Sequence, residues 1–345
     1  MSIRPDHPMT AQAPRRLCVA PMMAWTDRHC RYLHRLAAPH ALLFTEMITS
    51  GALRHGPAER LLRFHSSEHP VALQLGGSDP GELAEAAAAG AAAGFDEINL
   101  NVGCPSPRVR QGRFGACLMR EPALVAHCVR RMASAARVPV TVKCRLGVDD
   151  DDSEAFLERF VAEAAAAGCE TFYVHARKAL LNGLSPAENR TVPPLDYERV
   201  YRLKARHPEL EIVINGGIDT VGALDRHLAA VDGVMIGRAA YQQPMLLAAM
   251  DRHLFGAPAD AASERVPDPT IVVMSGYRRY MAHELDRGTR LADMTRHCLG
   301  LFAGRPGARQ FRRALSDARR LKANDLTLVD EALAALGDEV PARAA

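Results

Sequence analysis

Short apolar runs recur along the first 240 residues, and segments with helical periodicity separate them. Eight of these runs are rich in β-branched and large apolar residues, which is typical of strands buried on both faces. The predicted strands occupy residues 17–20, 42–46, 71–75, 97–101, 140–143, 172–175, 212–215 and 233–237. Strands of this kind favour parallel pairing, because parallel sheets are usually covered on both faces.

The segments between the strands predict helices, most clearly at residues 80–94, 121–136, 152–168 and 222–230. Eight parallel strands alternating with helices favour an α/β fold of the (β/α)8 or TIM-barrel type. An open doubly wound sheet is the alternative. A dinucleotide-binding sheet of that kind carries G-x-G-x-x-G after its first strand, whereas this chain has "APMMAWTD" there.

The pattern changes after residue 255. Residues 256–270, "GAPADAASERVPDPT", are rich in Ala, Pro and Asp and are typical of a linker. From residue 271 onward only helical patterns are visible. We therefore predict a barrel domain over residues 1–255, a linker over 256–270 and an all-helical domain over 271–345.

Composition and charge add a modest constraint. The chain has 345 residues, of which 48% are hydrophobic and 24% charged, and its net charge is +3. Residues 271–345 hold 13 Lys or Arg against 9 Asp or Glu, whereas the first 270 residues have a net charge of −1. The excess positive charge is therefore in the predicted helical domain.

The eight cysteines are scattered and form no Cys-x-x-Cys pair, which argues against a metal site of the zinc-ribbon type and against a thioredoxin motif. Scattered cysteines in a chain of this size favour a reducing cytoplasm over a disulfide framework. The N-terminal segment has no apolar core, and no run approaches the ~18 apolar residues that a membrane helix requires. We expect a cytoplasmic protein without a membrane segment.

Polar or otherwise special residues follow almost every predicted strand. In order they are Pro21, Met22 and Met23, then Glu46, Gln74, Asn101 with Cys104, Lys143, His175, Asn215 with Gly216 and Gly217, and Gly237 with Arg238. One such residue is commonly a structural hydrogen-bonding group. Eight strand ends that converge on one rim indicate a functional site, because chemistry in this fold gathers at the carboxyl ends of the strands.

The last two strand ends have the composition of a phosphate site. "NGG" at residues 215–217 and "GR" at 237–238 offer backbone N–H groups and a guanidinium. Glycine lets the backbone approach a phosphate closely, and the loops after strands seven and eight are the usual phosphate site of such barrels. The alternative is that these glycines only form tight turns.

Several segments together resemble the tRNA-dihydrouridine synthases, and most closely their A subfamily. They include "APMMAWTDRHCR", "EINLNVGCPSPRVRQGRFGACLM", "HARKALLNGLSPAENR", "INGGI" and "GRPGARQFRR", and the resemblance extends from about residue 17 to about residue 315. It implies an FMN cofactor, NADPH as electron donor and tRNA as substrate, with D-loop uridines 20 and 20a reduced to dihydrouridine. The flavin N5 would give hydride to uracil C6, and Cys104 would protonate C5.

Cys104 suits this role because it lies in a turn between a glycine and a proline. An ordinary thiol keeps its proton at neutral pH and can still donate it. The Gly103-to-Gly115 loop would close over the base. The alternative is an inert structural cysteine.

The resemblance also assigns the other strand-end residues. The implied FMN site consists of Pro21, Met22, Met23, Gln74, Lys143, His175, Asn215, Gly216, Gly217, Gly237 and Arg238. Lys143 would stabilise the negative charge of the reduced flavin ring. Asn101 would position the uridine, and Glu46 would only orient its neighbours.

A base in folded tRNA must be extruded to reach such a pocket, so the protein must hold nearby phosphates. Arg309, Arg312 and Arg313 have the spacing of one helix face, and guanidinium groups bind phosphate well. Arg177 and Arg190, after the sixth strand, would contact the same RNA. A solvated face is the alternative for the helix.

Two other functions remain open from the sequence. One is a flavin barrel that reduces a free pyrimidine or an enone, which would have no use for a basic helical tail. The other is a barrel that binds RNA or a phosphosugar and has no redox role.

Overall fold

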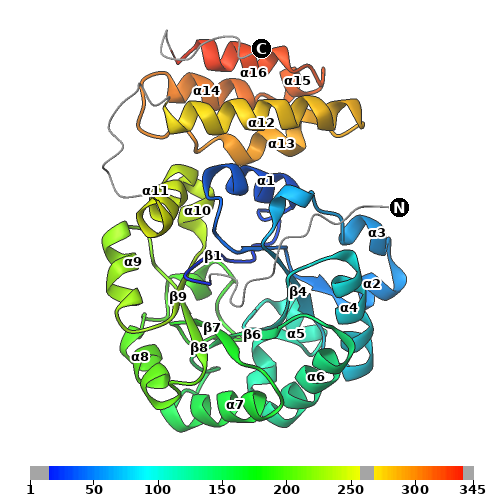
Figure 1. Cartoon of the computed structure of the whole chain (residues 1–345), viewed down its shortest axis with the longest axis vertical. Helices are drawn as coiled ribbons and strands as arrows, with labels where there is room; N and C mark the ends of the chain where they lie inside the picture. The colour runs from blue at the N-terminus through cyan, green and yellow to red at the C-terminus, as the bar shows by residue number, and fades with distance from the viewer. Residues whose placement is uncertain (1–14, 257–267, 337–345) are drawn as a thin grey trace.

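The computed structural model describes residues 15–256 and 268–336, and its centre is a barrel of parallel strands (Figure 1). The strands follow the order β1-β9-β8-β7-β6-β5-β4-β2, and β3 also pairs with β4. They are β1 (Leu17–Val19), β2 (Leu43–Phe44), β3 (Ile48–Thr49), β4 (Val71–Gly76), β5 (Glu97–Val102), β6 (Val140–Arg145), β7 (Thr171–His175), β8 (Glu211–Asn215) and β9 (Gly233–Ile236).

The sheet closes on itself between its first and second strands. Val19 N donates to Leu42 O at 2.9 Å, and Leu42 N donates to Leu17 O at 2.9 Å. This closure confirms the barrel and excludes the open doubly wound sheet. Each of the eight predicted strands is present, and the predicted strand 42–46 forms as β2 with the short β3 just beyond it.

Helices surround the barrel and connect its strands. They are α1 (Arg28–Ala37), α2 (Ser50–His55), α3 (Ala58–Leu61), α4 (Pro80–Ala93), α5 (Pro107–Gln111), α6 (Pro122–Ala135), α7 (Glu154–Ala166), α8 (Tyr197–Arg206), α9 (Val221–Leu228), α10 (Arg238–Gln242) and α11 (Pro244–Phe255). Short 3-10 turns occur at Ser66–Glu68, Gly115–Arg120 and Glu188–Arg190. The four helices predicted from periodicity are α4, α6, α7 and α9.

Side chains that cap the orphan backbone N–H groups define where several of these helices begin. Asp79 accepts from Glu82 N at the start of α4, and Ser153 accepts from Phe156 N at the start of α7. Each cap of this type stabilises its helix by about 1 kcal/mol. The helices therefore begin close to the strand ends that they follow.

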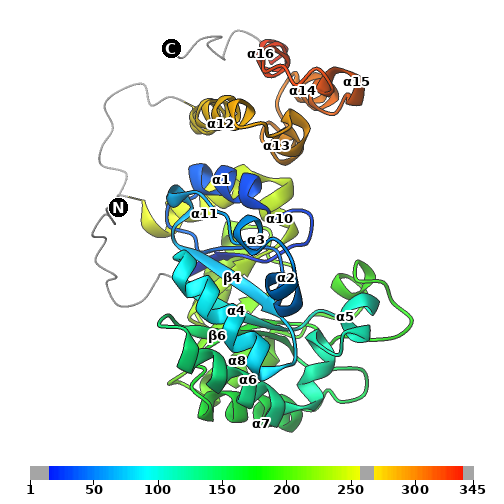
Figure 2. The ribbon, with the colours of Figure 1, turned by 90° about the vertical axis from the view of Figure 1, so that its right-hand side faces the viewer.

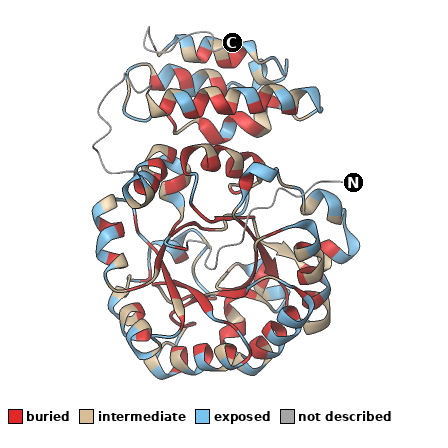
Figure 3. Ribbon diagram, in the orientation of Figure 1, coloured by how far each residue is buried: buried red, intermediate tan, exposed pale blue. Residues whose placement is uncertain are grey.

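The strands are buried along most of their length (Figure 3). Alternate residues of each strand point to opposite sides of the barrel wall. Outward-facing residues such as Ile98, Leu100 and Val142 join the large core between strands and helices. A second apolar cluster lies inside the barrel and contains Cys18, Ala20, Leu42, Phe44, Ala72, Tyr173, Val213 and Met235. The barrel is thus packed, and the cavity can open only at its end.

The C-terminal helices form a layer on one side of the barrel (Figure 2). They are α12 (Pro269–Asp286), α13 (Leu291–Cys298), α14 (Ala308–Leu315), α15 (Ala318–Leu321) and α16 (Thr327–Ala334). Their core includes Tyr277, Met294 and Phe311, and it also takes in Leu33 of α1 and Ala248 of α11. The shared core positions this layer beside the carboxyl ends of the strands.

The helical pattern begins slightly earlier than predicted. Asp268 caps α12, whose first residue is Pro269, because the proline ring is preorganised for the first helical turn. Residues 269 and 270 therefore belong to a helix, and residues 257–267 of the predicted linker lie outside the described part of the chain. The division into domains stays a prediction.

Candidate active site

A cavity of about 1680 Å³ lies at the carboxyl ends of the strands, between the barrel and the turn that joins α12 to α13. Most of the residues predicted from the strand ends line it. They are Pro21, Met22, Met23, Glu46, Gln74, Asn101, Cys104, Lys143, His175, Arg190, Asn215, Gly216, Gly217, Gly237 and Arg238. The structure therefore brings together residues that lie more than two hundred positions apart in the sequence.

The cavity lining is strongly cationic. It contains twelve Arg or Lys residues against four Asp or Glu residues. The basic members are Arg28, Arg31, Arg60, Arg63, Arg108, Lys143, Arg145, Arg190, Arg238, Arg287, Arg290 and Arg296. A concave surface with this charge concentrates an anionic ligand.

Cys104 lies two residues beyond the end of β5, and its side chain is half-buried at the cavity. Hydrogen bonds fix the peptide groups on both sides of Cys104. Gly103 N and Cys104 N donate to Asn101 Oδ1 at 3.1 and 3.0 Å, and Ala116 N donates to Cys104 O at 2.9 Å. The thiol is thus presented from a fixed backbone, and closure of the following loop stays a prediction.

Asn101 and Gln74 form one hydrogen-bonded unit beneath this turn. Asn101 Nδ2 donates to Gln74 Oε1 at 2.8 Å, and Gln74 Nε2 donates to Asn99 Oδ1 at 2.8 Å. Both side chains are more than 90% buried, yet both reach the cavity wall. Asn101 therefore holds the Cys104 turn, and its predicted contact with uridine remains a prediction.

Lys143 extends from β6 into the cavity without a carboxylate partner among the described residues. Its Nζ donates to Asn215 Oδ1 at 3.0 Å, and Asn215 Nδ2 donates to Met235 O at 2.8 Å. Burial, together with the nearby Arg145 guanidinium, lowers the pKa of Lys143 to about 8. A buried amine with a lowered pKa at a cavity wall is typical of a functional site.

His175, at the end of β7, is buried against the turn that follows β8. Burial holds the pKa of His175 well below its usual value, and the surrounding cations lower it further, so the ring is neutral at pH 7. A Cβ on Gly216 would lie 2.9 Å from the His175 ring, and a Cβ on Gly217 would lie 2.9 Å from the Tyr197 hydroxyl.

Both of these glycines also have positive φ, 125° for Gly216 and 68° for Gly217. Any larger residue would be strained there and would clash as well. Tyr197 completes the turn by donating its hydroxyl hydrogen to Gly216 O at 2.7 Å. The "NGG" segment is therefore a tight turn, and its backbone forms part of the cavity wall.

Arg238 begins α10, and its guanidinium is exposed at the cavity. Its one hydrogen bond within the described residues is a long one of 3.4 Å, from Nη2 to Arg190 O. Arg190 itself has its pKa lowered by burial and by the nearby Arg238. Two neighbouring guanidinium groups, neither of which pairs with a carboxylate among the described residues, favour an anion at this point.

The segment after β1 forms another wall. Met22 and Met23 line the cavity, and Met23 is 63% exposed at its mouth. Ala24 has a φ of 61°, and its N–H donates to Glu46 Oε1 at 2.5 Å. Glu46 thus stabilises a strained turn, which agrees with an orienting role.

The predicted RNA-contacting residues divide into two groups. Arg190 lines the cavity, whereas Arg177 does not. Arg177 Nη1 donates to Pro193 O and Thr191 O and so braces its own loop. Arg309, Arg312 and Arg313 are exposed on α14 and lie outside the cavity lining. Their contact with RNA stays a prediction.

Arg145 is a site residue that sequence reasoning missed. Its Nε donates to Gly103 O at 3.1 Å, and its Nη1 donates to Asn189 O at 2.9 Å, so it joins the Cys104 turn to the loop after β7. Burial lowers its pKa to about 10. The sequence could have predicted Arg145 as a site residue, because it is two positions after Lys143 and the alternation of side chains along a strand places both on one face.

A set of arginines at the cavity mouth was also missed. They are Arg60, Arg63, Arg108, Arg287, Arg290 and Arg296. Arg63 pairs with Glu284 at 3.5 Å, Arg290 pairs with Asp293 at 2.7 Å, and Arg296 donates to Ala24 O. Arg60, Arg108 and Arg287 form no side-chain hydrogen bond or ion pair with the rest of the described chain. No sequence periodicity links these positions, since three of them lie on three different helices, α3, α5 and α13, and the others lie between helices.

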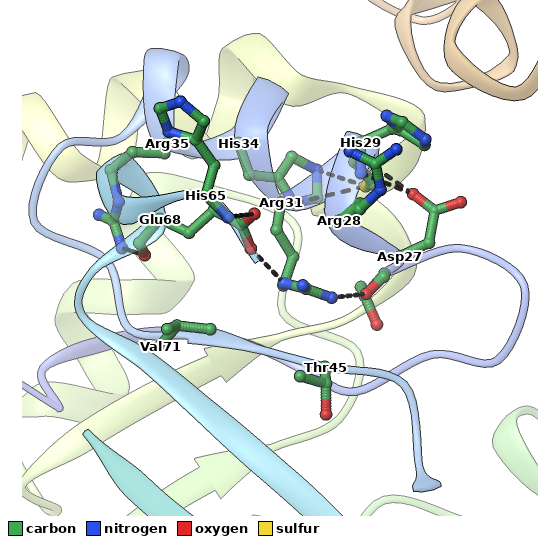
Figure 4. Close-up of polar contacts among 12 residues, drawn as sticks. Asp27, Arg28, His29, Arg31, His34, Arg35, Thr45, His65, Glu68 and Val71 are labelled. Carbon is green, nitrogen blue, oxygen red and sulfur yellow. Dashed lines mark hydrogen bonds and ion pairs between the residues drawn. The ribbon is translucent and has the colours of Figure 1, made fainter. Parts of the chain in front are cut away.

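Helix α1 lies between the barrel and the C-terminal helices (Figure 1) and contributes to the cavity wall. Figure 4 shows its polar contacts. Asp27 caps it by accepting from His29 N and Cys30 N. Arg31 Nε pairs with Glu68 Oε2 at 2.6 Å, and both side chains are at least 95% buried. Arg28 pairs with Glu284 of α12 at 2.5 Å. These contacts fix the cavity wall to both parts of the chain.

Within residues 15–256 and 268–336, the structure contains no helix long and apolar enough to cross a membrane. The same ranges contain no group of three or more His, Cys, Asp or Glu side chains placed to hold a metal ion. All eight cysteines are free.

Comparison with known proteins identifies close relatives. A family model described as "Dihydrouridine synthase (Dus)" matches residues 18–336. The tRNA-dihydrouridine(20/20a) synthase of Xanthomonas axonopodis pv. citri is 53% identical over 330 residues, covering 94% of this chain and 96% of the relative. Its counterpart in Escherichia coli K12 is 52% identical, covering 94% of this chain and 92% of the relative.

The fold is also similar to that of a solved structure, morphinone reductase. The TM-score is 0.51 at 15% sequence identity, and the match covers 76% of this chain and 88% of the other. This likeness concerns the fold alone.

Proposed function

The chain belongs to the dihydrouridine synthase family, and we propose that it reduces uridines 20 and 20a in the D-loop of tRNA to 5,6-dihydrouridine. The observation that carries this proposal is the half-buried Cys104 thiol, presented from a fixed turn into a cationic cavity. The names of relatives at 52–53% identity support the substrate and its positions.

The cavity residues fit an FMN cofactor. Arg238, the Gly216–Gly217 turn and the nearby Arg190 offer cations and close backbone approach for a phosphate. Lys143, which has no carboxylate partner within the described chain, suits an electron-rich ring, and Gln74 offers an amide beside it. When bound, FMN would accept hydride from NADPH and supply hydride to C6 of the uracil.

The residues of the chain then have three tasks. The neutral His175 and the Gln74–Asn101 pair line the pocket into which the base would be extruded. Cys104 would donate the thiol proton to C5 as hydride reaches C6, so that the C5–C6 double bond gains one hydride and one proton. The thiolate that remains would recover a proton from solvent.

The RNA would be held at the mouth of the cavity. Arg60, Arg108 and Arg287 carry guanidinium groups there without partners in the described chain. Arg190 extends the same positive surface from the barrel side, and the predicted helical domain over residues 271–345 contributes its share of the platform. We also place the protein in the cytoplasm, where tRNA and NADPH occur, which suits its eight free cysteines.

A flavin barrel acting on a free pyrimidine or enone is the main alternative, and the cationic mouth disfavours it because such substrates carry no phosphates. The test uses purified protein, NADPH and unmodified tRNA, with free uridine in parallel. We expect bound FMN, NADPH oxidation that depends on tRNA, and dihydrouridine mapped by mass spectrometry at positions 20 and 20a. Equal rates on free uridine would favour the alternative, and absence of flavin would favour a barrel without a redox role.

A further inference from the structure

A continuous column of buried polar side chains crosses the barrel from its closed end to the Cys104 turn. Its members are Glu97, Thr141, Asn99, Gln74 and Asn101, which come from β4, β5 and β6. Each is at least 92% buried. Only Gln74 and Asn101 reach the cavity, so Glu97, Thr141 and Asn99 have no place in the function proposed above.

The lower end of the column is a carboxylate that can only accept. Glu97 Oε2 accepts from Arg15 Nε at 2.8 Å. Glu97 Oε1 accepts from the Tyr173 hydroxyl at 2.9 Å and from Thr141 Oγ1 at 2.7 Å. Because Thr141 donates its one hydroxyl hydrogen to Glu97, it offers only lone pairs to its other neighbour.

The direction of the hydrogen bond from Thr141 to Glu97 determines the orientation of each amide side chain between Thr141 and the Cys104 turn. Asn99 must present its Nδ2 to Thr141 Oγ1, at 2.8 Å, which turns Asn99 Oδ1 toward Gln74 Nε2. Gln74 then presents Oε1 to Asn101 Nδ2. Asn101 Oδ1 therefore faces the turn that carries Cys104.

The upper end of the column requires the same direction independently. Gly103 N and Cys104 N can only donate, and both point at Asn101 Oδ1. If the three amides were flipped, the Asn101 NH2 group would face two N–H donors. Buried donors without acceptors are costly, so acceptor-only and donor-only groups at the two ends select one orientation for the whole column.

We propose that Thr141 and Asn99 are positioning residues, whose hydrogen bonds to Glu97 and Gln74 orient Asn101 and so hold the Cys104 thiol in place. Neither touches the cavity, and each acts through the next member of the column. The part of this inference that concerns turnover rests on the proposed function, whereas the position of the thiol does not.

The test removes one link without changing its shape. Thr141→Val keeps the volume but has no hydroxyl, Thr141→Ser restores the hydroxyl, and Tyr173→Phe removes a different hydroxyl from the same carboxylate. The readout is the alkylation rate of Cys104 by iodoacetamide in the purified full-length protein. Trypsin separates the two half-buried cysteines, because Cys104 falls in peptide 64–108 and Cys117 in peptide 114–120.

Thr141→Val should speed alkylation of Cys104 by at least about threefold, because a turn that loses its buried anchor opens more often. Thr141→Ser and Tyr173→Phe should stay near the wild-type rate, and Cys117 should serve as an internal standard that does not change. Turnover on tRNA should fall on the order of tenfold in Thr141→Val with an unchanged KM for tRNA, because a displaced proton donor slows the chemical step.

A wild-type alkylation rate in Thr141→Val would overturn the inference. An equal acceleration in Tyr173→Phe, or at Cys117, would also overturn it, since it would indicate general loosening of the barrel. If Thr141→Val does not fold, Asn99→Ser interrupts the next link and is judged by the same criteria. If Cys104 proves to have no role in turnover, the proposed function fails, and the alkylation rates still decide this inference.

Discussion

Replacing Arg60 and Arg287 with alanine tests whether the mouth of the cavity holds the phosphates of the RNA. The two residues lie on different segments of the mouth, one on α3 and one beyond the end of α12. Both are exposed, and neither has a side-chain partner among the residues that the structure describes. Their removal therefore deletes charge without breaking an internal ion pair.

The expected change in the salt dependence of tRNA binding follows from counterion release. Each phosphate contact contributes about 0.7 to 0.9 to the slope of log affinity against log salt, so losing two contacts should reduce the slope by about 1.4 to 1.8. Between 50 and 200 mM salt, wild-type affinity should then fall about 7- to 12-fold more than that of the variant. FMN content and NADPH-driven flavin reduction should not change.

The charge-matched comparison is the Arg309→Ala, Arg312→Ala protein, which tests the second predicted RNA surface by removing the same charge from the exposed face of α14. The assay is fluorescence anisotropy with unmodified tRNA at four or more salt concentrations. A shallower slope in the Arg309, Arg312 variant together with a wild-type slope in the Arg60, Arg287 variant would refute the reasoning and place the platform on α14. Unchanged slopes in both would exclude both surfaces.

Three further predictions concern the cavity itself. Cys104→Ala should keep FMN and its reduction by NADPH but lose at least ~10²-fold in tRNA uridine reduction, and near-normal turnover would contradict the acid role. Arg238→Ala should weaken FMN binding roughly 10- to 100-fold, the scale of one charge-assisted hydrogen bond, as measured by flavin fluorescence during titration. Because burial lowers the pKa of Lys143 to about 8, its ammonium is lost as the pH rises through that value. FMN affinity should then fall by up to about tenfold per pH unit above 8, whereas Lys143→Met should show no such dependence.

The barrel could be predicted because its outward-facing residues are apolar in every strand. The polar interior was less visible, although "EINLNV" in β5 alternates Glu97, Asn99 and Asn101 with Ile98 and Leu100. A strand with this alternation normally has one face in water. Here the polar face lies inside a closed barrel, and only the closure shows that these side chains must satisfy one another.

Cavity residues that lie close to a strand end were easier to predict from the sequence than cavity residues that lie elsewhere. Cys104 follows β5, Asn215 ends β8 and Lys143 lies two residues before the end of β6, and the barrel geometry brings all three to one rim. Arg60 lies on the short helix α3 and Arg287 just beyond the end of α12, and their approach to the cavity depends on tertiary packing that no local pattern encodes. The α14 arginines show another limit of prediction from sequence. Their spacing predicts that they share one face of a helix, but it does not predict whether that face points toward the cavity.

The distribution of charge explains why a nearly neutral protein could still attract RNA to one place. The net charge of the chain is +3, whereas the cavity lining alone has a formal charge of +8, so the remainder carries −5. The net negative charge outside the cavity lining repels phosphates from most of the surface. The positive charge of the concave lining focuses the electric field at the cavity mouth. The resulting potential would guide the RNA toward the opening above Cys104, and it would be screened over roughly 8 Å at physiological ionic strength. Approach from a distance would therefore depend on salt, in addition to the counterion release at each phosphate contact.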